Sequence, residues 1–132
     1  MDNTKFLRFN QRKQNFDRAL GLLAKQSAKH NFDDENIAAT LHFFEMTFEL
    51  AWKLLKDFLE VQGVIVKSPR DAIKTAFAMD YIDDGHLWLE MLDARNMITH
   101  TYDENTAKTL FIAIKDKFLP ALMKLGELQC MD

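Results

Sequence analysis

Apolar side chains recur along this chain at the three- and four-residue spacing of an α-helix, and β-branched residues never alternate over a useful length. Only 4 Gly and 2 Pro interrupt the pattern. We expect five helices, at about residues 4–30, 34–62, 68–78, 84–100 and 105–128. Long and medium helices joined by short links predict an all-α fold: an antiparallel four-helix up-down bundle with an additional short helix.

The helix expected at about 34–62 carries the widest apolar face. Asp33 or Asp34 can cap its start, and Gly63 stands where a glycine commonly ends a helix. Its apolar positions cover an arc of roughly 200°, which is wider than one core contact needs. Such a helix either lies centrally in the bundle or buries a second face in another subunit.

Two further signals concern helix ends. Ser68, Pro69 and Asp71 stand where a helix favours an N-cap residue, a proline at its first position and an acid in its first turn. In the last helix, Pro120 removes one backbone hydrogen bond and clashes with the preceding turn. We therefore expect that helix to kink or break after about Asp116.

Length and charge limit the classes of function. The 132 residues predict a single domain spanning 1–132, with ordinary globular contents of 48% hydrophobic and 28% charged residues. The formal net charge is −3, whereas proteins that bind duplex DNA through bulk electrostatics are normally basic. Duplex DNA is therefore not an expected partner, although a few local cations would suffice for an RNA site.

The expected compartment is the cytoplasm. The first fourteen residues carry several charges, which is unlike a signal peptide, and no apolar run approaches the length of a membrane span. A single cysteine, Cys130, excludes an intrachain disulfide. We expect no metal site, because neither HExxH nor CxxC occurs and His30, His42 and His86 share no ligand spacing.

Arg95 is the residue that points most clearly to chemistry. It falls in the middle of the Leu, Met and Trp arc of its helix, where an arginine is almost never buried unless it is paired. It therefore needs a carboxylate, a phosphate or a groove into which it can emerge. A purely architectural pairing with Glu45 or Glu49 is one alternative, and phosphate binding is the other.

His100 and Asn96 share a face of the same helix at i, i+4 spacing, and an extended residue 101 would place Tyr102 on the same side. A group that titrates near neutral pH beside a permanent cation suits phosphodiester chemistry. Alternatively, His100 bonds the last carbonyls of its helix and Tyr102 is an ordinary surface residue. Arg95 would reach these groups around the helix edge or from a second copy of the chain in a two-fold dimer.

Glu49 and Lys53 are secondary candidates. Their i, i+4 spacing predicts an ion pair on a helix surface, and we interpret it as a solvated edge rather than as catalytic machinery.

The octet Arg95–Tyr102 resembles the Arg-x4-His-x-Tyr motif of the HEPN superfamily, named for higher eukaryotes and prokaryotes nucleotide-binding. Further segments resemble a bacterial branch called nucleotidyltransferase substrate-binding proteins. These segments are 48–56, 68–73, 82–85, Trp88 and 93–96. The resemblance covers roughly residues 6–125.

The resemblance implies a helical bundle that dimerises through the motif faces and binds a minimal nucleotidyltransferase encoded beside it. Many HEPN proteins are metal-independent ribonucleases and act as toxins of toxin–antitoxin pairs. By this resemblance His100 is the acid and base, Arg95 holds the phosphate, and Asn96 orients the phosphate or His100. No cofactor is implied.

In the toxin relatives the partner transfers AMP to the tyrosine that corresponds to Tyr102, which silences the ribonuclease. The branch name implies instead a non-catalytic subunit that presents a substrate or nucleotide to the nucleotidyltransferase. The residues do not decide between these uses, nor do they exclude a purely structural dimer. The chain is not itself the nucleotidyltransferase, because it lacks the Gly-Ser and paired-Asp signature of such enzymes.

Overall fold

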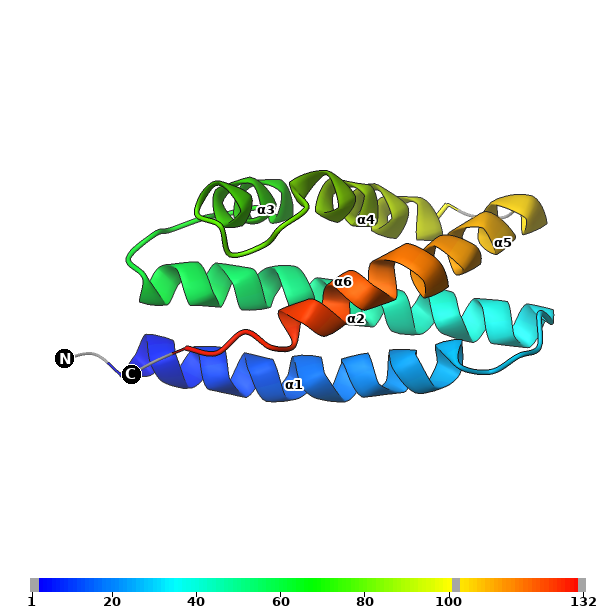
Figure 1. Ribbon diagram of the computed structural model, residues 1–132, viewed down its shortest axis with the longest axis horizontal. Coiled ribbons are helices and arrows are strands. Elements are labelled where there is room, and N and C mark those ends of the chain that lie inside the picture. Colours follow the sequence, from blue (N-terminus) through cyan, green and yellow to red (C-terminus); the bar gives the residue numbers. More distant parts are fainter. Residues whose placement is uncertain (1–2, 101–102, 131–132) are drawn as a thin grey trace.

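A computed structural model describes residues 3–100 and 103–130 of the chain, and these residues form a helical bundle (Figure 1). The elements in chain order are α1 (Thr4–Ser27), α2 (Asp34–Val61), α3 (Pro69–Ala78), α4 (Gly85–Ile98), α5 (Glu104–Ala113), a π-helical segment η1 (Ile114–Phe118) and α6 (Leu119–Leu125). α1, α2, α4 and the continuous stretch from α5 to α6 run in alternating directions along the long axis (Figure 1). The predicted up-down bundle is confirmed, with α3 as the additional short helix.

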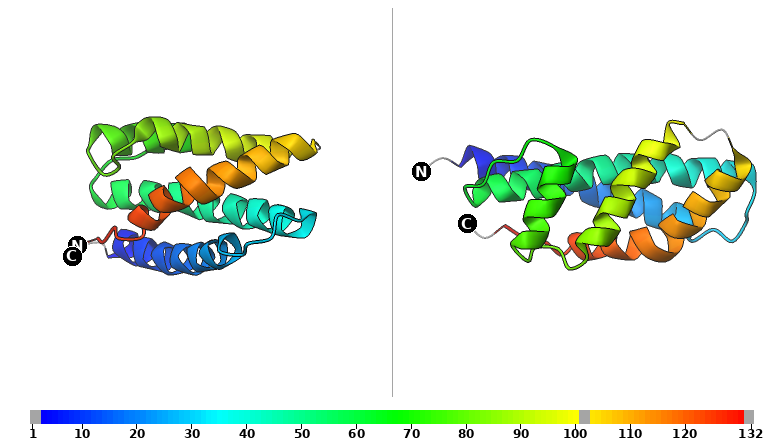
Figure 2. Two further views of the ribbon diagram at one scale, coloured as in Figure 1. Left: turned by 45° about the vertical axis from the view of Figure 1, so that its right-hand side comes forward. Right: turned by 90° about the horizontal axis from the view of Figure 1, so that it is seen from above.

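α2 is the central element of the bundle. Within the described residues it contacts every other helix, and the left view of Figure 2 shows it between α1 and the later helices. Phe44 of α2 stacks on Phe118 with ring centroids 5.4 Å apart, and Phe48 packs against Trp88 of α4 at 6.2 Å. The wide apolar arc of this helix is thus explained by its central position.

The ends of α2 follow from local hydrogen bonding. The Asp33 carboxylate accepts a hydrogen bond of 2.8 Å from the backbone N–H of Asn36, which identifies the N-cap residue. Gly63 has φ +88°, a conformation that favours glycine, and the next N–H, of Val64, donates to the Leu59 carbonyl at 2.9 Å. Both predicted signals are therefore confirmed, with Asp33 as the cap.

α3 begins as predicted, since the Ser68 hydroxyl accepts a hydrogen bond of 3.1 Å from the Asp71 N–H. The last helix differs from the prediction in detail. It does not break after Asp116. Instead the π-helical segment η1 includes this residue, and the helix continues as α6 with Pro120 in its first turn. Because proline has no N–H to donate, a π-helical turn just before it accommodates the missing bond.

Two helices end earlier than the sequence pattern predicts. α1 ends at Ser27 rather than near residue 30, and α4 ends at Ile98 rather than at His100. The second difference affects the candidate site, because Arg95 and Asn96 lie in the last turn of α4 whereas His100 lies just beyond its C-cap residue, Thr99.

A buried ion pair joins α1 to α2. Arg12 Nε donates to Asp57 Oδ2 at 2.9 Å, and the Asp57 side chain is only 1% exposed. Loss of Arg12 would leave an uncompensated charge in the interior.

Among the described residues, no helix combines the length and apolar character needed to cross a membrane.

We predict that Phe48→Ala lowers the free energy of unfolding by about 3–5 kcal/mol, because it removes a fully buried ring that joins α2 to α4. Urea titration monitored by circular dichroism measures this loss. Leu7→Ala is the control: Leu7 is exposed, so its truncation should change stability by less than about 0.5 kcal/mol. Equal effects of the two variants would contradict the assigned core.

Candidate functional site

The predicted residues Arg95, Asn96 and His100 line one surface depression of about 630 Å³ between α2 and α4. Its complete lining is Glu45, Met46, Glu49, Arg95, Asn96, Thr99 and His100. Glu49 thus joins the predicted cluster, whereas Lys53 lies outside the lining. We call this depression the Arg95 groove.

Arg95 is anchored at both terminal nitrogens. Nη2 donates to Glu49 Oε2 at 2.5 Å and Nη1 donates to Asn96 Oδ1 at 2.9 Å. The side chain remains 28% exposed, so the cation is held by a carboxylate and also opens to the groove. The architectural pairing that the sequence left open is present, but it does not bury the guanidinium.

Glu49 connects two cations. Its Oε1 lies 3.4 Å from Lys53 Nζ, which confirms the predicted i, i+4 pair, while Oε2 accepts from Arg95. Burial raises the pKa of the Glu49 carboxyl, but the hydrogen bond and charge of Arg95 outweigh burial, and the pKa lies below its ordinary value of 4.5. Trp52 and Lys53 assist.

His100 is exposed in the turn that follows α4, and its backbone N–H donates to the Met97 carbonyl at 2.9 Å. Its imidazole forms no hydrogen bond or ion pair with any other described side chain or carbonyl. The alternative in which the imidazole bonds the last carbonyls of the helix is therefore not seen in the described part of the chain. Tyr102 lies outside the described residues.

The charges in the Arg95 groove are mixed. Glu45 and Glu49 contribute two carboxylates against the single guanidinium of Arg95. Over the ranges 3–100 and 103–130, no three His, Cys, Asp or Glu side chains gather closely enough to hold a metal ion. An anion that enters the groove can reach Arg95, but it meets a carboxylate already bound there.

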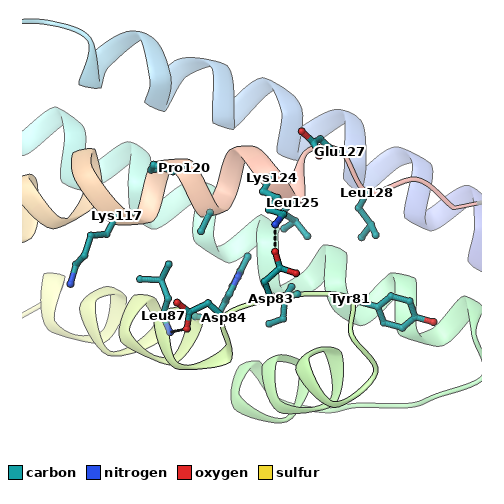
Figure 3. A pocket seen from close by; sticks show the side chains of 13 residues that line it. Tyr81, Asp83, Asp84, Leu87, Lys117, Pro120, Lys124, Leu125, Glu127 and Leu128 are labelled. Atoms are coloured by element: carbon teal, nitrogen blue, oxygen red, sulfur yellow. Dashed lines mark hydrogen bonds and ion pairs between the residues drawn. The ribbon is translucent and has the colours of Figure 1, made fainter.

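A second pocket, of about 470 Å³, lies at the opposite end of α4 between the turn before this helix and α6 (Figure 3). Leu87, Pro120 and Leu125 contribute apolar walls, and an ion pair between Lys124 and Asp83 joins its two sides. None of the predicted site residues lines this pocket.

Sequence reasoning missed three lining residues of the Arg95 groove and the whole second pocket. Glu45 had been considered only as a partner of Arg95, and Met46 and Thr99 not at all. The i, i+4 spacing of Glu45 and Glu49 was a usable signal, because it places both carboxylates on one face of α2. The second pocket gave no such signal, since its walls come from segments about forty residues apart.

Comparisons with known proteins place these features in a family context. A family model described as "Nucleotidyltransferase substrate binding protein like" matches residues 11–129, which include the octet and the groove. The chain is 27% identical over 101 residues to a Haemophilus influenzae protein named "Probable ribonuclease HepT", covering 73% of this chain and 69% of that protein. A solved crystal structure of a Thermus thermophilus protein matches with a TM-score of 0.74 and 30% identity, covering 85% of this chain and 92% of that chain.

We predict that the Glu49–Arg95 pair stabilises the bundle at neutral pH and loses this effect in acid. Because the folded-state pKa of Glu49 is lowered, its contribution is present above the ordinary value of 4.5 and disappears as the pH falls through the folded-state value. Glu49→Gln should therefore be less stable than the wild type at pH 7, by at most about 1 kcal/mol for so exposed a pair.

The measurement is the difference in the free energy of urea unfolding between wild type and Glu49→Gln at pH 7 and at pH 3. The difference should be smaller at the lower pH. Glu45→Gln is the control, because Glu45 forms no ion pair with another described residue. A difference that is the same at both pH values would show that the pair is not ionic in origin.

Proposed function

The chain belongs to the nucleotidyltransferase substrate binding protein like family, and from this membership we propose that it is the HEPN subunit of a two-component toxin–antitoxin system. Membership confirms the resemblance to the nucleotidyltransferase substrate-binding branch of the HEPN superfamily. In the proposal, a single HEPN-like domain binds a minimal nucleotidyltransferase and cleaves RNA without a metal ion. The similarity to a protein named as a probable ribonuclease supports the activity.

One observation carries the proposal: Arg95, Asn96 and His100 line a single open groove. The guanidinium is partly exposed, and the imidazole forms no bond with another described side chain. A fixed cation beside an accessible acid–base group is the minimum needed to bind a phosphodiester and to transfer a proton to or from it.

The proposed reaction uses the RNA itself as nucleophile. The 2′-hydroxyl attacks the adjacent phosphorus, the bond from phosphorus to the 5′-oxygen breaks, and the products are a 2′,3′-cyclic phosphate and a 5′-hydroxyl. One His100 accepts the proton of the 2′-hydroxyl, and a second imidazole donates a proton to the leaving oxygen. Arg95 stabilises the extra negative charge on phosphorus in the transition state.

The need for a base and an acid in the same reaction favours a two-fold dimer, because two copies supply two imidazoles. The surface beside the groove suits such an interface. Met46, which lines the groove, is 41% exposed on α2. Exposed apolar side chains that flank a polar groove are typical of protein contacts, and methionine adapts readily to a partner surface.

A second function is a non-catalytic subunit that binds a nucleotide and presents it to the nucleotidyltransferase. The description of the matching family, a nucleotidyltransferase substrate binding protein, supports this alternative. Saturable binding of AMP that requires Arg95, without RNA cleavage, would identify it.

We predict that the purified protein cleaves single-stranded RNA in EDTA, and that His100→Ala lowers the rate at least about 100-fold, as expected for loss of a general acid and base. Gel analysis of labelled RNA measures the rate. DNA of the same sequence should resist cleavage, because it has no 2′-hydroxyl. His86→Ala is the matched control, since His86 is an exposed histidine at the opposite end of α4.

The same assay tests the shared cleft. His100→Ala should be inactive, and wild-type protein mixed and re-equilibrated with an excess of His100→Ala should lose more activity than simple dilution predicts, because each mixed dimer keeps only one of the two imidazoles. Activity in simple proportion to the wild-type fraction would contradict a site built from two copies.

We predict that Tyr102 accepts AMP from the partner. After incubation with the purified nucleotidyltransferase and ATP, the intact mass should rise by one AMP unit and RNA cleavage should fall. Tyr102→Phe should abolish both changes. The chain has 2 Tyr, so Tyr81→Phe is the matched control and should be modified like the wild type. Modification that persists in Tyr102→Phe would rule out this acceptor.

A further inference from the structure

The Glu49 carboxylate accepts a hydrogen bond from the Arg95 terminal nitrogen Nη2, which a bound phosphate would also use. A guanidinium binds carboxylates and phosphates in the same way, through parallel N–H···O bonds from its terminal nitrogens. In this structure Nη2 already donates to Glu49 and Nη1 to Asn96. Both terminal nitrogens therefore have a partner within the chain before any ligand arrives.

We propose that Glu49 is an internal competitor for the phosphate site on Arg95, and that it determines which anions the groove accepts. The inference rests on the proposed function in one respect, namely that the groove binds phosphate. An incoming phosphate displaces the carboxylate from Nη2, while Asn96 continues to hold Nη1. Glu49 is thus a specificity-determining residue that contacts the binding group rather than the reacting atoms.

Lys53 lowers the free energy needed to displace Glu49 from Arg95. Its Nζ lies 3.4 Å from the Glu49 oxygen that Arg95 does not use. Because Glu49 and Lys53 are both on α2, whereas Arg95 is on α4, a side-chain rotation separates the carboxylate from Arg95 without moving the backbone. The displaced carboxylate keeps a counter-ion, so no charge is left unpaired.

The competition selects among ligands. A single weakly bound phosphate gains little from displacing a carboxylate, because one ion pair replaces another. A polynucleotide that contacts two copies of the groove replaces two such pairs in one binding event and adds contacts outside them. The penalty of displacing Glu49 is the same at each groove for either ligand, so a mononucleotide keeps little net affinity, whereas RNA stays bound through its additional contacts.

The central test is Glu49→Gln, which keeps the shape of the side chain and removes its charge. We expect the Kd for AMP, measured by calorimetry, to fall about fivefold, the size expected for loss of a partly exposed competing ion pair. The gain should disappear in the double variant Glu49→Gln with Arg95→Ala. Lys53→Met should weaken AMP binding, because the displaced carboxylate then lacks its second cation.

Glu45→Gln is the matched control. It removes an identical charge from the same groove, but its carboxylate forms no ion pair with another described residue. An equal gain in Glu45→Gln and Glu49→Gln would overturn the proposal, because it would show a general electrostatic effect. Weaker AMP binding or a lower kcat for RNA in Glu49→Gln would also overturn it, since that result indicates that Glu49 only positions Arg95.

A second readout does not depend on any ligand. Phenylglyoxal modifies accessible guanidinium groups, and peptide mass spectrometry reports the rate at Arg95 alone. We expect faster modification of Arg95 in Glu49→Gln than in the wild type or Glu45→Gln. Faster modification without binding of AMP or RNA would support the role of Glu49 in blocking Arg95 and would contradict the proposed function. Unchanged modification would contradict the role of Glu49.

Discussion

The packing of α2 against every other helix is the constraint on which the fold and the candidate site both depend. Its aromatic side chains occupy the core on several sides, which fixes the rotation of the helix about its own axis. That rotation determines where its polar side chains emerge. Glu45 and Glu49 consequently face the last turn of α4. The position of the Arg95 groove therefore depends on the packing of the core as well as on the polar residues that line it.

The helical arrangement could be predicted because its signals are local. Periodicity gave the elements, Asp33, Gly63 and Ser68 marked their ends, and the wide arc of α2 anticipated its central place. The octet likewise named Arg95, Asn96 and His100, but it left open whether Arg95 reached the other two around the helix edge or from a second copy. In the structure all three line one groove of a single chain. The sequence therefore identified the candidate residues that come from this one short segment of the chain.

Features that depend on two distant segments could not be predicted in the same way. The pairing of Arg95 with Glu49 rather than Glu45 joins positions 46 residues apart, and the choice depends on the exact rotation of α2 against α4. The end of α4 at Ile98 was equally hidden, because neither Thr99 nor His100 is a glycine or proline that would mark a helix end. The second pocket arises from the approach of α6 to the turn before α4, which no local pattern encodes.

The π-helical segment before Pro120 has a consequence for how the chain tolerates changes in length. A π-turn contains one residue more than the α-turn it replaces, so it is equivalent to a single-residue insertion held within a continuous helix. Deleting that residue would turn everything after it by about 100° and carry Leu122 and Leu125 away from the interior. A one-residue insertion or deletion in η1 during evolution would therefore rotate α6 about its own axis and leave the orientation of the preceding helices unchanged.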